Sequence, residues 1–301
     1  MIKNSTPVGW IGLGKMGLPM CSRLLDTGYA LTVYNRTAEK TKSLAKRGAT
    51  VASSPEEVAS VCPVVFSMVS DDGVLESVTL GEEGVLKGAR EGSIFIDMST
   101  VSPRASAKVA QAALQKGVRY LRAPVSGSTK FAEAGTLTLF VSGPRETYEG
   151  CAAVLKNLGQ RFFYFGPGEE ARYMKLLINM MVGTTALMVA EALTFGEKSG
   201  IDWQAMLDGI QNSAVGSPLF GYKAQTLRER NFTPNFTIDQ ITKDLDLALQ
   251  TANTLHVPLP VTSLGRQFFE AMRSTGRGDW DFFGLLVLFE EISGFPKTKE
   301  R

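Results

Sequence analysis

Short apolar runs alternate with amphipathic stretches from Val8 to about Gly166. The runs are VGWI, LTVYN, VVFSMV, IFIDMS, VRYLRAPV, TLTLFVSG and RFFYFG, and candidate helices separate them. This alternation is typical of a mostly parallel sheet covered by helices on both faces. Gly28 fits the end of the first helix, and Pro55 fits the start of a later one. The pattern predicts an α/β domain over residues 1–166.

The pattern changes after the segment Gly166-Pro167-Gly168. Strand-like runs vanish and long helical patterns continue, so residues 167–301 are predicted to form an all-helical domain. The longest pattern runs from Glu169 to Ser199 without proline and carries apolar residues on more than one stripe. A helix that is apolar around its circumference is predicted to be buried, either at the centre of its domain or against another subunit.

The first chemical signal is the hexapeptide GLGKMG, which directly follows the first predicted strand and precedes a helical stretch. In such a motif the first glycine permits a tight turn, the second lets the backbone approach a pyrophosphate, and the third allows close packing of helix and strand. The helix N-terminus adds N–H donors and positive potential. This context favours a Rossmann-type dinucleotide site over an ordinary tight turn. Its predicted cofactor-binding residues are Gly12, Leu13, Gly14, Met16 and Gly17.

The second predicted strand ends at Asn35, Arg36 and Thr37. NAD-specific domains place an acid there, about 20 residues beyond the glycines, to bind the ribose 2′-OH. Asn35 lacks the charge that would repel a 2′-phosphate, and Arg36 offers a fork of donors that suits one. The alternative is that Arg36 is only a solvated residue at a strand end. These three residues are predicted to bind the cofactor, with NADP preferred over NAD.

Composition narrows the class of protein without identifying it. Of 301 residues, 44% are hydrophobic and 21% charged, as in soluble two-domain proteins. A net charge of +2 makes no case for nucleic acid. The three widely spaced cysteines argue against a disulfide framework or a thiolate metal cluster. We see no signal peptide and no segment of the roughly 20 apolar residues that a membrane span needs. We therefore expect a cytoplasmic protein without a membrane or nucleic-acid partner.

Three further features of the sequence are not interpreted as catalytic or metal-binding. His256, the only histidine, is interpreted as structural because one histidine without partners cannot hold a metal. The acids Asp239, Asp244 and Asp246 are scattered by helical spacing and are interpreted as a solvated face. The apolar stretch 282–289 is expected to pack the helical domain or a subunit interface. No metal cofactor is predicted.

Five motifs occur in a fixed order along the chain. They are GLGKMGLPM, Asp97-Met98-Ser99-Thr100 with Pro103, the segment APVSGS at 123–128, Lys175 with Asn179, and Lys243-Asp244. In this order the chain resembles the β-hydroxyacid dehydrogenases, also called the 3-hydroxyisobutyrate dehydrogenase family, over nearly its whole length. The resemblance implies a Rossmann domain, an all-helical domain and a cleft between them. It also implies hydride transfer between a nicotinamide and a short hydroxy acid or its carbonyl partner.

The resemblance makes Lys175 the catalytic residue, and Asn179 lies one helical turn further on. Hydride delivery to a carbonyl carbon builds negative charge on the oxygen, and a lysine can stabilise that charge and supply a proton. A lysine on a wet helix face is the alternative interpretation of Lys175.

The remaining site residues also come from the resemblance. It implies that Thr100, the turn Ser126-Gly127-Ser128 and Lys243 hold the substrate carboxylate, and that Met68 and Ser70 lie along the cofactor. Thr100 and Lys243 are counted as cofactor-binding as well. A Gly/Ser turn can bind an anion through its N–H groups. For Lys243, an ordinary charged face of an amphipathic helix is the alternative.

Two departures from the family bear on the substrate. Many members have two adjacent asparagines after the catalytic lysine, whereas this chain has Ile178 at the first of these positions and keeps only Asn179. In addition, Arg122 and Ser128 stand where many members have Asp and Gly. Both resemble the branch that reduces glyoxylate and succinic semialdehyde. The leading hypothesis is therefore NADPH-dependent reduction of a small carboxylate-bearing aldehyde or keto acid, the class of glyoxylate, succinic semialdehyde and tartronate semialdehyde, by a homodimer or homotetramer. The alternatives are oxidation of 3-hydroxyisobutyrate or another 3-hydroxy acid, and a catalytically silent NADP-binding scaffold.

Overall fold

The computed structural model describes residues 5–295 and divides into two compact units, Met1–Lys175 and Leu176–Arg301. The division falls inside helix α9 (Glu170–Lys198). The boundary predicted after residue 166 precedes this helix. Each unit has a hydrophobic core of its own.

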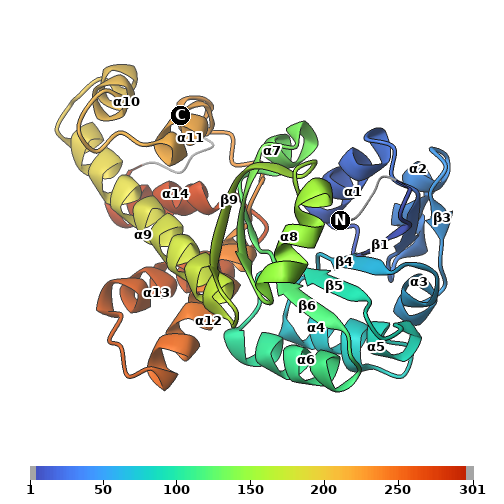
Figure 1. Ribbon diagram of the computed structural model, residues 1–301. Coiled ribbons are helices and arrows are strands. Elements are labelled where there is room, and N and C mark those ends of the chain that lie inside the picture. Colours follow the sequence, from blue (N-terminus) through green and yellow to red (C-terminus); the bar gives the residue numbers. More distant parts are fainter. Residues whose placement is uncertain (1–4, 296–301) are drawn as a thin grey trace. The chain divides into compact units, whose positions relative to one another are not determined.

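Within residues 5–295, the first unit is built on a nine-stranded sheet (Figure 1). The strands are β1 (Val8–Ile11), β2 (Leu31–Tyr34), β3 (Thr50–Val51), β4 (Val64–Ser67), β5 (Ile94–Asp97), β6 (Arg119–Arg122), β7 (Val125–Ser126), β8 (Leu137–Ser142) and β9 (Gly159–Gly166). Their order is β3-β2-β1-β4-β5-β6-β8-β7, and β9 pairs with β8. Strands β1 to β6 are parallel, whereas β8 is antiparallel to β6 and β7. The predicted fold class is confirmed. Strand β3 was not predicted because both of its residues are exposed and form no apolar run. The single predicted run VRYLRAPV is divided in the structure into β6 and the start of β7.

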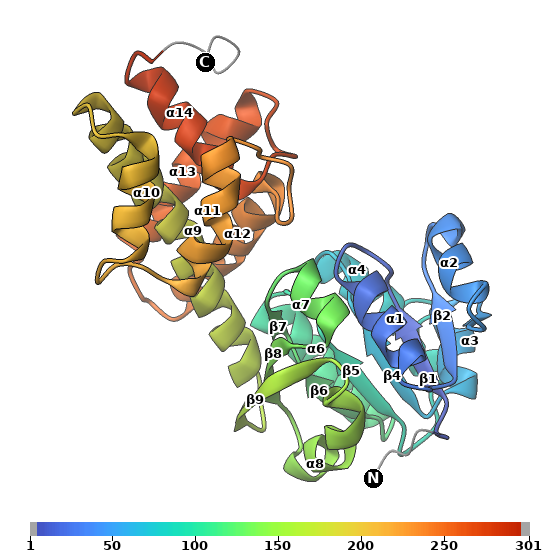
Figure 2. The same cartoon turned by 90° about the horizontal axis from the view of Figure 1, so that it is seen from above.

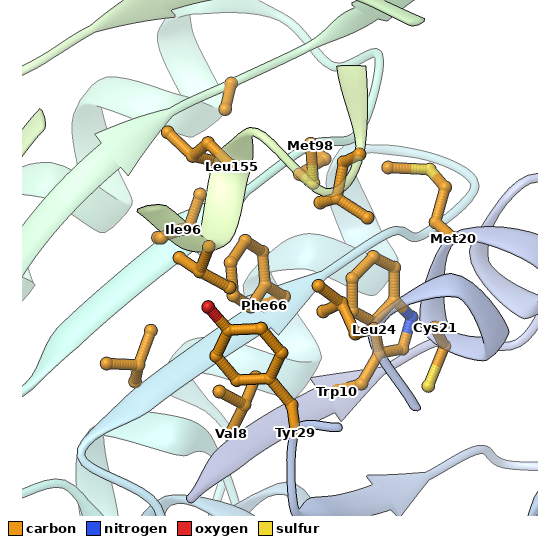
Figure 3. Close-up of a cluster of buried hydrophobic side chains, with 14 of the residues drawn as sticks. Val8, Trp10, Met20, Cys21, Leu24, Tyr29, Phe66, Ile96, Met98 and Leu155 are labelled. Atoms are coloured by element: carbon orange, nitrogen blue, oxygen red, sulfur yellow. The ribbon is translucent and has the colours of Figure 1, made fainter. Parts of the chain in front are cut away.

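Helices cover both faces of this sheet, as the apolar runs predict. They are α1 (Gly17–Asp26), η1 (Ala38–Thr41), α2 (Lys42–Ala45), α3 (Pro55–Val61), α4 (Asp72–Leu80), α5 (Val85–Gly88), α6 (Pro103–Gln115), α7 (Thr129–Ala134) and α8 (Arg145–Leu155). Alternate side chains of each strand enter different core layers. Figure 3 shows part of one layer, in which the rings of Trp10 and Phe66 stack beside Leu24 of α1. The centroids of the two rings are 5.4 Å apart. Val65 and Phe95 face the other layer, which includes residues of α3, α4 and α6.

Local signals set the helix ends as expected. Helix α3 begins at Pro55, and the side chain of Ser54 accepts a hydrogen bond from the N–H of Glu57. Helix α1 ends at Asp26, and Gly28 has a φ of 88°, a left-handed conformation that glycine adopts without strain.

The second unit is helical, as predicted. With the later part of α9 it contains α10 (Trp203–Gln211), α11 (Pro218–Glu229), α12 (Ile238–Thr254), α13 (Pro260–Ser274), η2 (Phe282–Gly284) and α14 (Leu285–Ile292) (Figure 2). Among the residues described in this unit, none lies in a named strand, although Thr237 and Asp281 form an isolated bridge. The apolar stretch 282–289 lies in the core of the unit. Its predicted packing role is therefore confirmed.

A buried ion pair adds to this helical core. Lys223 of α11 and Asp281, which precedes η2, are 2.5 Å apart between Nζ and Oδ2. Burial lowers the pKa of Lys223, and the neighbouring Asp281 opposes that effect. Asp281 also accepts a hydrogen bond from the N–H of Phe283, so its carboxylate connects two helical elements.

Helix α9 is only partly buried within this chain, and the predicted alternative, burial against another subunit, stays a prediction. Leu187, Ala190 and Leu193 lie in the core, whereas Leu177, Met181, Met188 and Phe195 are between 46% and 75% exposed. By length and composition alone α9 is also apolar enough to cross a membrane, so the prediction that no segment reaches that length is wrong. Core helices of soluble proteins pass the same test.

Candidate functional site

The carboxyl ends of the parallel strands lie side by side in hydrogen-bond register. Ile11 of β1 pairs with Tyr34 of β2 and with Ser67 of β4, Ser67 pairs with Asp97 of β5, and Asp97 pairs with Arg122 of β6. The strand order reverses between β1 and β4. Open α/β sheets bind ligands at such a switch point, outside the carboxyl ends of the strands. The register therefore gathers the glycine loop and the predicted cofactor segments at one edge.

The three glycines of the loop have different surroundings. Gly12 has a φ of 95°, and a Cβ there would lie 2.3 Å from the carbonyl oxygen of Met68. A Cβ on Gly17 would lie 2.0 Å from the carbonyl oxygen of Gly12. A Cβ on Gly14 would meet nothing within 4 Å. The first and third glycines are therefore required by the chain itself, and the second leaves open space beside the backbone, which fits a bound pyrophosphate.

Asn35 has a structural role that the sequence did not reveal. Its Oδ1 accepts a hydrogen bond from the N–H of Leu13 at 2.8 Å, and its Nδ2 donates to the carbonyl oxygen of Thr37 at 3.0 Å. The neutral amide thus joins the glycine loop to the end of β2. Arg36 and Thr37 are exposed, and within residues 5–295 Arg36 makes no hydrogen bond or ion pair. A guanidinium in that state is accessible to an anion.

A buried carboxylate lies at the end of β5. Ser67 and Ser99 each donate a hydroxyl hydrogen bond to Asp97 Oδ1 at 2.6 Å, and Arg172 of α9 forms an ion pair with Oδ2. The hydroxyl of Ser99 also accepts from the N–H of Val69 at 2.8 Å. Asp97 therefore connects the segments that follow β4 and β5 with the first turns of α9.

Arg172 is bonded on several sides. It donates to the carbonyl oxygen of Ser99 at 2.6 Å, to Ser106 Oγ at 3.1 Å and to the Tyr120 hydroxyl at 2.9 Å. We call Asp97, Ser67, Ser99, Ser106, Tyr120 and Arg172 the Asp97 cluster, and all six are buried. Burial opposes the charge on Arg172, but Tyr120 and Asp97 outweigh it and hold the Arg172 pKa above its usual value. Burial raises the pKa of Tyr120 to about 12, so its phenol keeps its proton at neutral pH.

A second ion pair holds the start of α9. Arg122 Nε lies 2.9 Å from Glu169 Oε1, and the Arg122 guanidinium lies 4.6 Å from the centre of the Tyr120 ring. The carbonyl oxygen of Glu169 accepts from the N–H of Arg172 at 2.8 Å. Arg122 stands out in the sequence only as a departure from the family. In the structure it gives α9 a second attachment to the sheet.

These contacts place three predicted site segments on one connected framework. Met68 follows Ser67, Thr100 follows Ser99, and the half-buried Lys175 lies one helical turn beyond Arg172. The predicted carboxylate turn is separate from the Asp97 cluster: Ser126 ends β7, and Ser128 immediately precedes α7. Gly127 has a φ of 135°, and a Cβ there would lie 2.7 Å from Leu137 Cδ2, so this turn needs glycine.

In the second unit, Asn179 and Lys243 meet at one carboxylate. Asn179 is buried and its Nδ2 donates to Asp244 Oδ2 at 2.5 Å, while Lys243 Nζ lies 2.9 Å from Asp244 Oδ1. Asp244 is buried, so its interpretation as part of a solvated face is wrong. That interpretation suits Asp239 and Asp246, whose partners Arg273 and Arg266 lie toward the surface.

Metal and thiol chemistry find little support in the described chain. Within residues 5–295 no group of three or more His, Cys, Asp or Glu side chains is placed to hold a metal ion. Cys21, Cys62 and Cys151 are buried, and burial raises the pKa of each thiol, which disfavours the reactive thiolate.

Two family models match the chain. The NAD-binding domain of 6-phosphogluconate dehydrogenase matches residues 7–166, and the NAD-binding domain of NADP-dependent 3-hydroxyisobutyrate dehydrogenase matches residues 170–289. The chain belongs to the 3-hydroxyisobutyrate dehydrogenase-like family. The predicted family is confirmed.

Individual relatives of this dehydrogenase-like chain differ in name and length. It is 36% identical to glyoxylate/succinic semialdehyde reductase 1 of Arabidopsis thaliana, covering 93% of this chain and 96% of that protein. It is 33% identical to cytokine-like nuclear factor N-PAC of Xenopus tropicalis over 93% of this chain, and spans about half of that relative, 53% of its length. The crystal structure of 3-hydroxyisobutyrate dehydrogenase from Salmonella typhimurium matches with a TM-score of 0.86 at 25% identity, covering 94% of this chain and all of that one.

The glycine loop generates a paired prediction. Gly17→Ala should destabilise the protein without cofactor, because its Cβ would overlap the carbonyl oxygen of Gly12. Gly14→Ala should leave that stability nearly unchanged, because its Cβ meets open space, and should weaken dinucleotide binding if a pyrophosphate approaches there. Thermal unfolding without ligand and NADPH titration separate the two effects. Equal losses of stability in both variants would contradict this account of the loop.

Proposed function

We propose that this protein is an NADPH-dependent reductase of small aldehydes or keto acids that carry a carboxylate, the class of glyoxylate, succinic semialdehyde and tartronate semialdehyde. The observation that carries the proposal is the Asp97 cluster, which connects the start of the lysine-bearing helix with the segments beside the glycine loop. The matched reductase of Arabidopsis thaliana supports the substrate class.

Reduction of the carbonyl needs one hydride and one proton. When bound, the nicotinamide supplies the hydride to the carbonyl carbon. We assign the proton to Lys175: its ammonium stabilises the charge that builds on the carbonyl oxygen and then protonates that oxygen to give the hydroxyl group. Solvent returns the proton to the lysine amine. In the oxidative direction the same amine would accept a proton from the hydroxy acid.

The substrate carboxylate is assigned to Thr100, the turn Ser126-Gly127-Ser128 and Lys243. The turn offers backbone N–H groups beside a glycine with a positive φ, a geometry that suits anions. We keep Asn179 as the residue that orients the carbonyl oxygen. Its bond to Asp244 fixes the rotamer of its amide, which is what an orienting group needs.

The preference for NADP is proposed from the end of β2. Asn35 is neutral and held by Leu13 and Thr37, so no carboxylate faces a 2′-phosphate there. Arg36 is exposed and can bind that phosphate through two parallel donors. The match to a model named for an NADP-dependent enzyme is consistent with this choice. We assign Met68 and Ser70 to the cofactor as well, because Met68 adjoins Gly12.

Two other functions are tested against this one. Oxidation of 3-hydroxyisobutyrate or another 3-hydroxy acid would use the same residues. A silent NADP-binding scaffold is suggested by N-PAC, which is named as a nuclear factor, but Lys175 is present in this chain and favours catalysis. We also propose a cytoplasmic homodimer or homotetramer, in which the exposed apolar residues of α9 are the natural candidates for a subunit contact.

The substrate class predicts a requirement for a negative charge. With NADPH, catalytic efficiency should be highest among glyoxylate, succinic semialdehyde, tartronate semialdehyde and methylmalonate semialdehyde. Propionaldehyde should be poor because it leaves the anion-binding groups unpaired. Initial rates of NADPH consumption measure this. A propionaldehyde efficiency equal to that of succinic semialdehyde would show that no carboxylate site exists, and no turnover with any compound would favour the scaffold.

The role of Lys175 predicts that its removal lowers turnover and leaves the affinity for NADPH unchanged. Lys175→Ala should lower kcat at least about 100-fold, the scale for removing a positioned acid, and leave the NADPH dissociation constant nearly unchanged. Lys175→Arg should rescue little, because guanidinium does not give up its proton. Lys156→Ala, at an exposed site after α8, is the matched control. Normal turnover of Lys175→Ala would exclude the assigned role.

The end of β2 predicts cofactor selectivity. A charge-assisted hydrogen bond contributes roughly 1.5 to 3 kcal/mol, so NADPH should bind about 10-fold to 150-fold more tightly than NADH. Arg36→Gln should weaken NADPH binding and leave NADH binding unchanged, and adding Asn35→Asp should erase or invert the preference. Binding titrations of both cofactors to each variant are the measurement. Equal dissociation constants in the wild type would contradict the assignment.

A further inference from the structure

The stability of the fold alone does not explain why the Asp97 cluster contains a buried ion pair with so many hydrogen bonds. One carboxylate accepts from Ser67 and Ser99 and pairs with Arg172, while Arg172 also bonds the Ser99 carbonyl oxygen, Ser106 and Tyr120. A buried ion pair often contributes no more to stability than apolar side chains of the same volume would. A core of this kind therefore does not need two charges at this position.

The charges do supply directional bonds between distant parts of the chain. Arg172 and Asp97 are 75 residues apart in sequence, and Arg172 and Ser99 are 73 apart. The planar guanidinium donates in a fixed fork, so its four partners fix the rotation of α9 about its axis as well as its distance from β5. Lys175 follows Arg172 by one turn on the same helix, so that rotation also sets the direction of the lysine side chain.

We infer that Asp97 and Arg172 are positioning residues that set Lys175 relative to the segments after β4 and β5. The Arg122–Glu169 pair holds the residue before α9 and assists them. This inference rests on the proposed function, since it gives the alignment a purpose in proton transfer. It adds two residues to the working site, neither of which was predicted to touch substrate or cofactor.

The decisive variant removes both charges together. In Asp97→Asn/Arg172→Gln neither partner is left as an unpaired buried charge, so the melting temperature should stay near that of the wild type. The amide side chains cannot reproduce the fork, so kcat should fall by about 10-fold to 100-fold, as expected for a misplaced catalytic group. The NADPH dissociation constant should change less than about threefold, a ratio equivalent to under 1 kcal/mol. Arg172→Lys should recover only part of kcat.

The matched control is Arg145→Gln, which breaks an exposed ion pair with Glu149 on α8 in the same unit. It should leave kcat, NADPH binding and melting temperature unchanged. Amide hydrogen exchange gives a readout that does not depend on turnover. The amides of residues 172–175 should exchange faster in the double variant than in the wild type or the control, while those of α1 should not change.

The outcomes separate this inference from the proposed function. A wild type without reductase activity would defeat the proposed function, and unchanged exchange at residues 172–175 in the double variant would defeat the positioning role even then. Normal kcat in the double variant would also overturn it. A loss of NADPH affinity as large as the loss of kcat would show that the cluster serves the cofactor segment instead of Lys175. If Arg172→Lys fails to fold, the charge-free double variant still carries the test.

Discussion

The contact between Asp97 and Arg172 is the constraint on which the placement of the start of α9 depends. Two full charges lie out of water, so each must be satisfied by groups that the fold brings to it. Serines at or just after the ends of β4 and β5 donate hydrogen bonds to the carboxylate. Ser106, Tyr120 and a backbone carbonyl accept hydrogen bonds from the guanidinium. Breaking either partner would leave a buried charge, at a cost of about 3 to 5 kcal/mol. The start of α9 is therefore fixed to the sheet.

The parallel strands of the sheet position the proposed cofactor-binding segments. Because β1 to β6 are parallel and in register, their carboxyl ends present backbone and short polar side chains along one edge. Gly12 and Gly17 let the loop fold tightly against Met68 and α1, and Gly14 leaves the space that a pyrophosphate needs. The binding features thus come from close backbone packing, whereas the proposed chemistry comes from a single lysine on a helix attached to that packing.

Much of this architecture follows from local patterns. The apolar runs predicted the strands except β3 and β7, the latter because one run covers both β6 and the start of β7. The spacing of the glycines predicted the dinucleotide loop. Partners distant in sequence were not predictable in this way. Arg172 resembles any basic residue near a helix start, and Asp97 was recognised as part of a family motif without its partner. Asp244 was misassigned because helical periodicity cannot distinguish a solvated carboxylate from one that a buried asparagine satisfies. The exposure of α9 depends on which neighbours cover it, and its own pattern does not contain them.

The proposed reaction is direct hydride transfer from NADPH to a carboxylate-bearing carbonyl compound. The most direct measurement uses NADPH that carries deuterium at both hydrogen positions of C4 of the dihydronicotinamide, so that either hydride transferred is labelled. Glyoxylate or succinic semialdehyde is the acceptor, and mass spectrometry follows the label. We expect one deuterium on the carbinol carbon of the hydroxy acid, formed in step with NADP⁺, and a strong loss of this product with Lys175→Ala. A hydroxy acid without deuterium, or label released only to water, would contradict it.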